Sequence, residues 1–247
     1  LTNLARAFET SQDHGLLEVR EVKNVLMIVV ASDRGLCGSF NTQIFKKIRE
    51  EILHPEKLKI NRIAGKKILS PVRDEDVRID FITVGKKGEG MVRKLKKEIV
   101  AAFADGVQFM TVADIKPISK IVIDEYLAKK YDKVVIIYTD YVSTVVQKTR
   151  IRQILPISKI DIEKQIAEMD VVAEEYGLKK PMQEYKVEPG PEEVLQFIIP
   201  RLIEMQVFHA ILESKASEES ARMMAMRNAS DAALEMSEDL TLTYNQI

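Results

Sequence analysis

The C-terminal part of the chain contains a long stretch of helix-forming residues. Between Pro191 and Ile247 there is no glycine, and Pro200 is the only further proline. The stretch begins as helices do, with Gly190, then Pro191 in the first turn, then two glutamates that suit the positive end of the helix dipole. A continuous helix would span about 85 Å, whereas a compact globule made from the rest would be about 40 Å across. We therefore expect a helix that projects beyond its body, as in a shaft, a lever or a coiled-coil arm.

The far half of this stretch carries an apolar stripe. Its residues step by three and four, a period near 3.5 that is typical of a coiled-coil seam. They are Met226, Ala229, Ala233, Met236, Leu240, Thr243 and Ile247. Because most of these side chains are small or flexible, the stripe would let a partner helix approach closely or turn against a surface.

Both ends of the sequence have the features of an interrupted helix. The stripe reaches Ile247 without a cap or a stop signal. Leu1, Leu4 and Phe8 lie on one face of what reads as the last turns of another helix. We interpret the two ends as truncated stumps of a longer antiparallel pair. The alternative is an ordinary long helix packed along the domain, with frayed ends.

The composition limits the possible functions. A hydrophobic content of 46% suffices for the core of one large domain, or of one domain with an appendage. No apolar run is long enough to predict a transmembrane helix. The net charge of −1 argues against a general nucleic-acid-binding protein. Cys37 is alone, which excludes an internal disulfide and fits a reducing compartment. The histidines form no metal-spaced pair, and no carboxylate pair lies in an apolar setting, so we expect no catalytic, cofactor-binding or metal site.

The middle of the chain alternates between apolar strands and amphipathic helices. Residues 25–31 and 133–139 are β-branched runs, which indicates strands buried on both faces of a sheet. We expect further strands at 58–64, 79–84 and 144–155, the last in a hairpin with its predecessor, and helices at 41–53, 65–72, 91–104 and 115–129. This order predicts an α/β fold: a mostly parallel sheet, flanked by helices on both faces, with one antiparallel edge.

A glycine loop follows the first strand. Its sequence, SDRGLCG at 32–38, stands where nucleotide-binding proteins place a phosphate loop. It matches neither G-x-G-x-x-G nor G-x-x-x-x-G-K-[ST], and Asp33 would bring negative charge near a phosphate. We interpret Gly35 and Gly38 as structural glycines that let the chain turn off the strand. A small α/β enzyme that binds a nucleotide at this loop is kept as the alternative.

Arg222 is the charged residue that stands out, because it lies where the apolar stripe begins. Glu218 and Glu219 precede it by four and three residues, which allows an ion pair within the helix. The same guanidinium would also suit the carboxylates or carbonyl oxygens of a partner protein. The sequence leaves both interpretations open.

Two segments together resemble the γ subunit of F-type ATP synthases. Residues 32–41 (SDRGLCGSFN) are similar to that family's glycine loop, and residues 215–231 (KASEESARMMAMRNASD) resemble its C-terminal helix motif, which 240–245 (LTLTYN) continues. The resemblance extends from about residue 22 to 247. It implies a Rossmann-like α/β domain strapped to an antiparallel coiled coil of the two terminal helices. Residues 1–21 would then be the end of the N-terminal helix and a linker, 22–189 the foot domain, and 190–247 the truncated axle helix.

The resemblance also implies a function. The family's γ subunit is the non-catalytic central-stalk rotor, which couples proton-driven rotation of the membrane c ring to conformational cycling of the catalytic β subunits. The chain would have no cofactor of its own. It would join α, β and ε subunits and the c ring as a peripheral protein on the cytoplasmic side of a bacterial plasma membrane, without inserting into the membrane or binding nucleic acid.

The resemblance assigns contacts to individual residues as well. Arg222, with Met226 and Glu218, would contact a β subunit, and Tyr185 and Glu188 would lie in the foot beside the c ring and ε. A static coiled-coil adaptor without a rotary role remains a further alternative.

Overall fold

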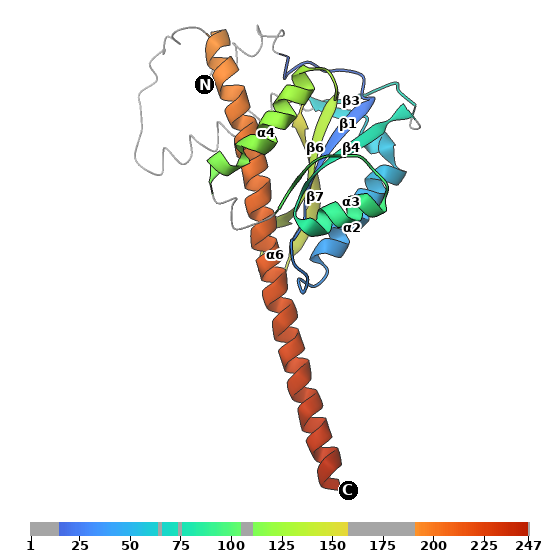
Figure 1. Ribbon diagram of the computed structural model, residues 1–247, viewed down its shortest axis with the longest axis vertical. Helices are drawn as coiled ribbons and strands as arrows, with labels where there is room; N and C mark the ends of the chain where they lie inside the picture. The colour runs from blue at the N-terminus through green and yellow to red at the C-terminus, as the bar shows by residue number, and fades with distance from the viewer. Residues whose placement is uncertain (1–14, 64–65, 74–75, 105–110, 158–190, 247) are drawn as a thin grey trace, which may run out of the picture.

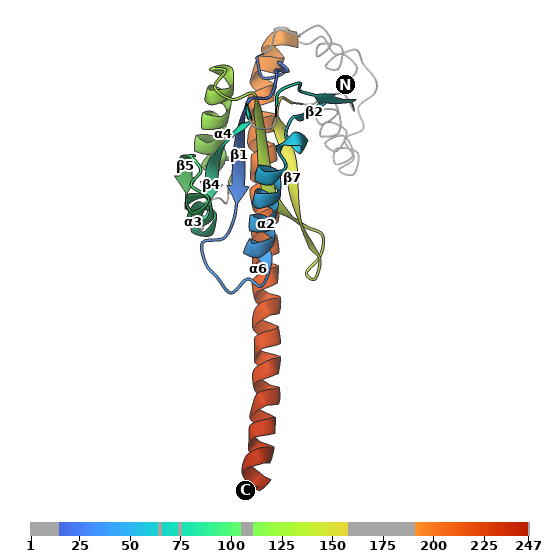
Figure 2. The same cartoon turned by 90° about the vertical axis from the view of Figure 1, so that its right-hand side faces the viewer.

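The computed structural model describes residues 15–63, 66–73, 76–104, 111–157 and 191–246. It consists of a sheet-based body and one helix, α6, that crosses the body and continues far beyond it (Figure 1). Figure 2 shows the same arrangement from the side, with the carboxyl end of β1 directed toward the projecting part of α6.

The body contains a five-stranded sheet in the order β5–β4–β1–β6–β7. The four strands from β5 to β6 run parallel, and β7 pairs antiparallel with β6 as a hairpin. In sheet order they are Ile99–Phe103, Arg78–Val84, Asn24–Val30, Lys133–Tyr141 and Gln147–Leu155. The mostly parallel sheet with one antiparallel edge is therefore confirmed.

Helices cover both faces of this sheet. On one face lie α2 (Phe40–Leu53) and α3 (Lys86–Lys94), and on the other lie α4 (Val112–Leu127) and α6 (Pro191–Gln246). The alternation of side chains along β1 explains how both faces are filled. Its residues Leu26 and Ile28 pack toward α4 and α6, whereas Val25, Met27 and Val29 pack toward α2 and α3. A strand covered on both faces needs the continuous apolar run that its sequence shows.

Two of the expected helices are wrong. Residues 65–72 contain a strand, β3 (Lys66–Leu69), which pairs antiparallel with β2 (Ile60–Ile63) in a separate small sheet that follows a short helical turn at Pro55–Lys57. The helix expected at 91–104 begins earlier, at Lys86, and ends at Lys94, while Ile99–Phe103 is the edge strand β5.

The second error has a physical cause. A glycine-rich segment such as 85–90 is typical of a turn, but Gly88 and Gly90 lie inside α3. Gly88 packs closely against β1, since a Cβ there would lie 3.2 Å from the Cβ of Ala31. Lys96 has a φ of 53°, which ends the helical path, and the short apolar run after it is one whose period cannot distinguish helix from strand.

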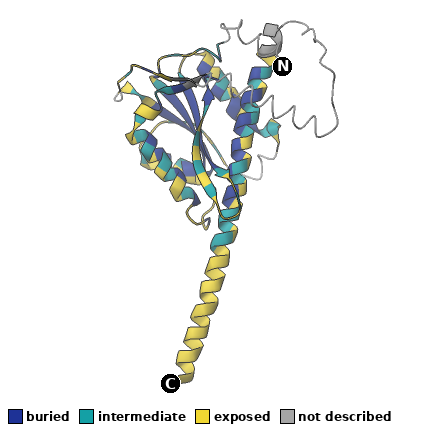
Figure 3. Ribbon diagram, turned by 180° about the vertical axis from the view of Figure 1, so that it is seen from behind, coloured by how far each residue is buried: buried dark blue, intermediate teal, exposed yellow. Residues whose placement is uncertain are grey.

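The projecting helix is confirmed. Its first half packs on β6 and α4 through a buried stripe with helical spacing. The stripe comprises Ile199, Leu202, Ile203, Val207, Ala210 and Ile211. From Met226 to Gln246 every residue is exposed, over a length of about 30 Å. Figure 3 shows this change from buried to exposed along one continuous helix.

The expected N-terminal partner helix falls on residues 1–14, which lie outside the described residues. The pairing of the two terminal helices therefore stays a prediction, as do the domain boundaries at 21/22 and 189/190. None of the described helices combines the length and apolar character needed to cross a bilayer.

Candidate functional site

The candidate site is the region where α6 leaves the body, beside the carboxyl ends of β1, β4 and β6. A groove of about 880 Å³ runs there between the glycine loop and α6. We call it the exit groove. It is lined by Gly35, Leu36, Cys37, Gly38, Asn41, Lys87, Ala225, Met226, Ala229 and Ser230.

The glycine loop forms one wall of the exit groove. Gly38 has a φ of 56°, in the left-handed region that favours glycine, and faces α6: a Cβ there would lie 3.9 Å from the Ala221 carbonyl oxygen and from the Ala225 Cβ. Gly35 has open space around it and no positive φ. The structural role of Gly35 stays a prediction, and the left-handed residue beside it is Leu36, with a φ of 63° and 77% of its surface exposed.

A polar network holds this loop in shape. Asn41 Nδ2 donates hydrogen bonds to Ser32 Oγ at 2.7 Å and to Cys37 Sγ at 3.1 Å. Ser32 Oγ donates to the carbonyl oxygen of Arg34 at 2.6 Å. The Cys37 side chain is buried. A buried thiol that accepts an amide hydrogen bond serves the loop structure rather than nucleophilic chemistry.

Hydrogen bonds also tie the loop to the start of α3 and to α2. Asp33 Oδ1 accepts the Lys86 amide at the start of α3 (2.9 Å), and the Ser32 carbonyl oxygen accepts the Lys87 amide (3.0 Å). The amides of Ser32 and Phe40 donate to Asn41 Oδ1 and to the Cys37 carbonyl oxygen. A phosphate loop needs free amides that converge on an anion. Here the Asp33 carboxylate takes the Lys86 amide at the start of α3 and places a negative charge in the loop, which argues against the nucleotide-binding alternative.

Gly85 is a structural residue of this region that the sequence analysis did not single out. Its φ is 94°, and a Cβ on it would lie 2.0 Å from the Ala31 carbonyl oxygen. The close approach lets β4 turn into α3 directly against the end of β1. The available signal in the sequence was a glycine directly after the strand expected at 79–84.

Arg222 lies on α6 just before the exit groove. It forms ion pairs with Glu218 and Glu219 on the preceding turn, and its side chain is only 15% exposed. Burial by itself lowers the pKa of Arg222, but the hydrogen bonds to the two glutamates outweigh it and hold the pKa above its ordinary value. Of the two interpretations, the structure therefore shows the ion pair of Arg222 within its own helix. A partner would meet Glu219, which is 71% exposed, before the arginine.

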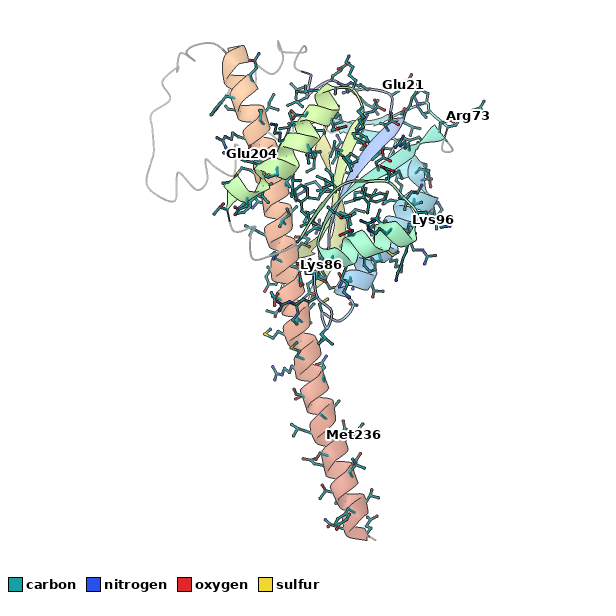
Figure 4. The ribbon with its side chains drawn as sticks, in the orientation of Figure 1. Glu21, Arg73, Lys86, Lys96, Glu204 and Met236 are labelled. Atoms are coloured by element: carbon teal, nitrogen blue, oxygen red, sulfur yellow. The ribbon has the colours of Figure 1, made fainter. Side chains whose placement is uncertain are left out.

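The apolar stripe continues from this point along the projecting helix. Met226 lies at its start, half exposed in the wall of the exit groove. Met236 is labelled far from the body in Figure 4, and its side chain is 65% exposed. Leu240 is exposed to a similar extent. Within the described residues nothing covers this stripe, so large apolar side chains that suit a partner surface face solvent.

Tyr185 and Glu188 lie outside the described residues. Among the residues that the structure describes, no three His, Cys, Asp or Glu side chains gather as metal ligands would. Lys86, Lys87, Arg93, Lys94, Lys96 and Lys97 are all exposed around α3, and Figure 4 labels Lys86 and Lys96 toward its two ends.

Comparisons with known proteins give one consistent result. A family model described as ATP synthase matches residues 1–247. The ATP synthase gamma chain of Dehalococcoides mccartyi is 35% identical over 94% of this chain and 70% of its own length, and that of Roseiflexus castenholzii is 36% identical over 94% and 69%.

Solved structures share the fold at lower identity. A central stalk and c-ring structure of the Tetrahymena thermophila mitochondrial ATP synthase matches with a TM-score of 0.60 and 20% identity, covering 93% of this chain and 85% of the other. A rotor structure of the Euglena gracilis mitochondrial ATP synthase matches with a TM-score of 0.58 and 18% identity, covering 98% and 80%.

Proposed function

Because this chain belongs to the family of ATP synthase gamma chains, we propose that it is the central-stalk rotor of such a complex. It is a non-catalytic subunit that couples rotation of a membrane c ring to conformational cycling of the catalytic β subunits. The structural observation that carries the proposal is the long helix that is rooted in the hydrophobic core and then projects, fully exposed, beyond the body.

The geometry suits mechanical coupling. A helix that is packed on β6 and α4 over its first half turns together with the body, because its buried side chains interlock with those of the core. The projecting half can then meet different partner subunits in turn. A rod that contacts the states of a neighbouring subunit unequally shifts the equilibrium between those states.

The partners and the location follow from this role. The projecting helix would enter a ring of α and β subunits, and the body would rest with ε on the c ring at the opposite end. The protein would be peripheral to an energy-coupling membrane, on the cytoplasmic side of a bacterial plasma membrane. The Dehalococcoides mccartyi and Roseiflexus castenholzii relatives are bacterial, which supports the choice of a bacterial membrane.

The finer assignments are part of the proposal. The N-terminal residues would form the second helix of an antiparallel coiled coil on the exposed stripe of α6. Arg222, Met226 and Glu218 would contact a β subunit, and their clustering beside the exit groove supports this role. Tyr185 and Glu188 would face the c ring and ε.

Reconstitution tests the proposal. The full-length protein should assemble with purified α and β subunits and restore their ATP hydrolysis, and removal of the projecting part of α6 should abolish activation while leaving the body folded. A full-length chain that neither joins nor activates the subunits would refute the rotor role. A static adaptor predicts assembly without any effect on ATP turnover. Tight, saturable nucleotide binding to the isolated chain would favour the enzyme alternative.

A further inference from the structure

The base of the projecting helix is fixed to the sheet by short polar side chains. Ser217 Oγ donates a hydrogen bond to the Thr139 carbonyl oxygen at 3.2 Å, and the Thr139 amide donates to Ser214 Oγ at 3.5 Å. Both serines are buried. Because their side chains are small, α6 lies close against the end of β6 here, just before it leaves the body.

Two carboxyl groups meet beside this contact. Glu213 precedes Ser214 on α6, and Asp140 follows Thr139 on β6, so the two carboxyl-bearing residues flank the hydrogen bond between these two elements. Because side chains alternate along a strand, Asp140 lies on the face of β6 that packs on α6. Glu213 Oε2 is buried and receives no hydrogen bond from the residues that the structure describes. Asp140 Oδ2 already accepts a hydrogen bond from Arg150 Nε at 2.6 Å.

A proton decides whether this pair attracts or repels. Two ionised carboxylates have only acceptors, so they cannot hydrogen-bond to each other. A protonated carboxyl can donate to its ionised neighbour in a short, charge-assisted bond. Since Asp140 has a guanidinium partner, Glu213 is the carboxyl that would carry the proton.

The charged groups around Glu213 favour this assignment. Burial and the neighbouring Asp140 both raise the pKa of Glu213 above its ordinary value, and they outweigh the opposing attraction of Arg152 on β7 and His209 on α6. Arg152 lies over the Tyr138 ring, 5.2 Å from its centroid, and His209 is exposed.

We propose that Glu213 and Asp140 form a proton-dependent clamp that holds the base of α6 against β6. The clamp is closed when Glu213 is protonated and loosens when Glu213 ionises. Its contribution to stability is complete below the ordinary glutamate pKa of 4.5 and is lost as the pH rises through the raised pKa of the folded state. Acidification would thus stiffen the joint between body and helix.

Amide exchange in the full chain tests the clamp without any partner subunit. The measurement follows residues 206–221 between pH 4 and pH 8, corrected for intrinsic exchange rates. Glu213→Gln keeps the shape and supplies a permanent donor. In the wild type, local opening should increase with pH, by about tenfold for each unit by which the pKa is raised. In Glu213→Gln this increase should disappear, and the two proteins should converge at acidic pH.

Two further variants complete the experiment. Asp140→Asn should also flatten the pH profile, because it removes the like charge. Glu235→Gln, on the exposed part of α6, should leave the profile unchanged. An unaltered profile in Glu213→Gln would overturn the proposal. Because no assembly or ATP assay is involved, this failure would be distinct from a failure of the rotor role.

Discussion

The most demanding backbone position in the body is Gly85, and its replacement by alanine gives a sharp test of the structure. The φ of 94° and ψ of 137° lie in a region that residues with a Cβ avoid, at a cost of about 1–3 kcal/mol. The added Cβ would also lie 2.0 Å from the Ala31 carbonyl oxygen. The clash is with backbone, so relief requires a shift of the β1 end, which costs about 1–3 kcal/mol more.

We therefore expect Gly85→Ala to lower the free energy of unfolding by about 2–6 kcal/mol, measured by urea denaturation followed by circular dichroism. The matched control is Gly90→Ala, five residues further along the chain and inside α3. Gly90 lies in α3 with open space around it, so alanine there should raise stability by about 0.5–1 kcal/mol. A loss below about 1 kcal/mol for Gly85→Ala, or the same sign for both variants, would refute the reasoning.

Three further predictions address the core, the surface charges and the proposed contact. Ile203→Ala, in the buried stripe of α6, should cost about 2–5 kcal/mol in the same assay, and a near-neutral result would mean that α6 is not anchored as described. Hydrogen bonds from Lys57 and Lys47 lower the pKa of Glu50 to about 2, so their stabilisation should be lost as the pH falls from 4.5 toward 2. Glu50→Gln should show a smaller loss of melting temperature over that interval, and parallel curves would contradict the ion pairs. Arg222→Ala should weaken β-subunit contact or coupling by about 1–3 kcal/mol in the reconstituted ATPase while the chain stays folded, and unchanged activity at equal thermal stability would count against the contact.

The sequence predicted those parts of the fold whose signal is local and continuous. The strands β1 and β6 contain continuous, β-branched apolar runs, which are typical of a strand covered on both faces. The projecting helix followed from the lack of breaking residues after Pro191 and from simple length. Both predictions depend on composition along one segment and need no knowledge of its neighbours.

The errors arose where tertiary packing decides. Gly88 reads as a turn residue in the sequence, but it allows α3 to approach β1, a contact that no local pattern reveals. The edge strand β5 is too short for its period to separate helix from strand. Gly35 and Gly85 were similarly indistinguishable in the sequence, because a positive φ is set by the surrounding chain.

The contact role of the candidate site stays a prediction, and the structure adds detail to it. The sequence placed Arg222 at the start of the exposed stripe and left its partner open. In the structure Arg222 pairs with Glu218 and Glu219. Any helix with residues at this spacing can form such a pairing. The contact between Ser217 and Thr139 joins residues 78 positions apart, so no sequence pattern could have predicted it.

Observation of single assembled complexes tests the central claim most directly. Immobilised α and β subunits would hold the projecting helix, and an optical reporter would be attached to the body of this chain. The account predicts sustained rotation of the reporter in one direction when ATP is added, and none without ATP. A stable complex that hydrolyses ATP while the reporter stays in place would contradict it.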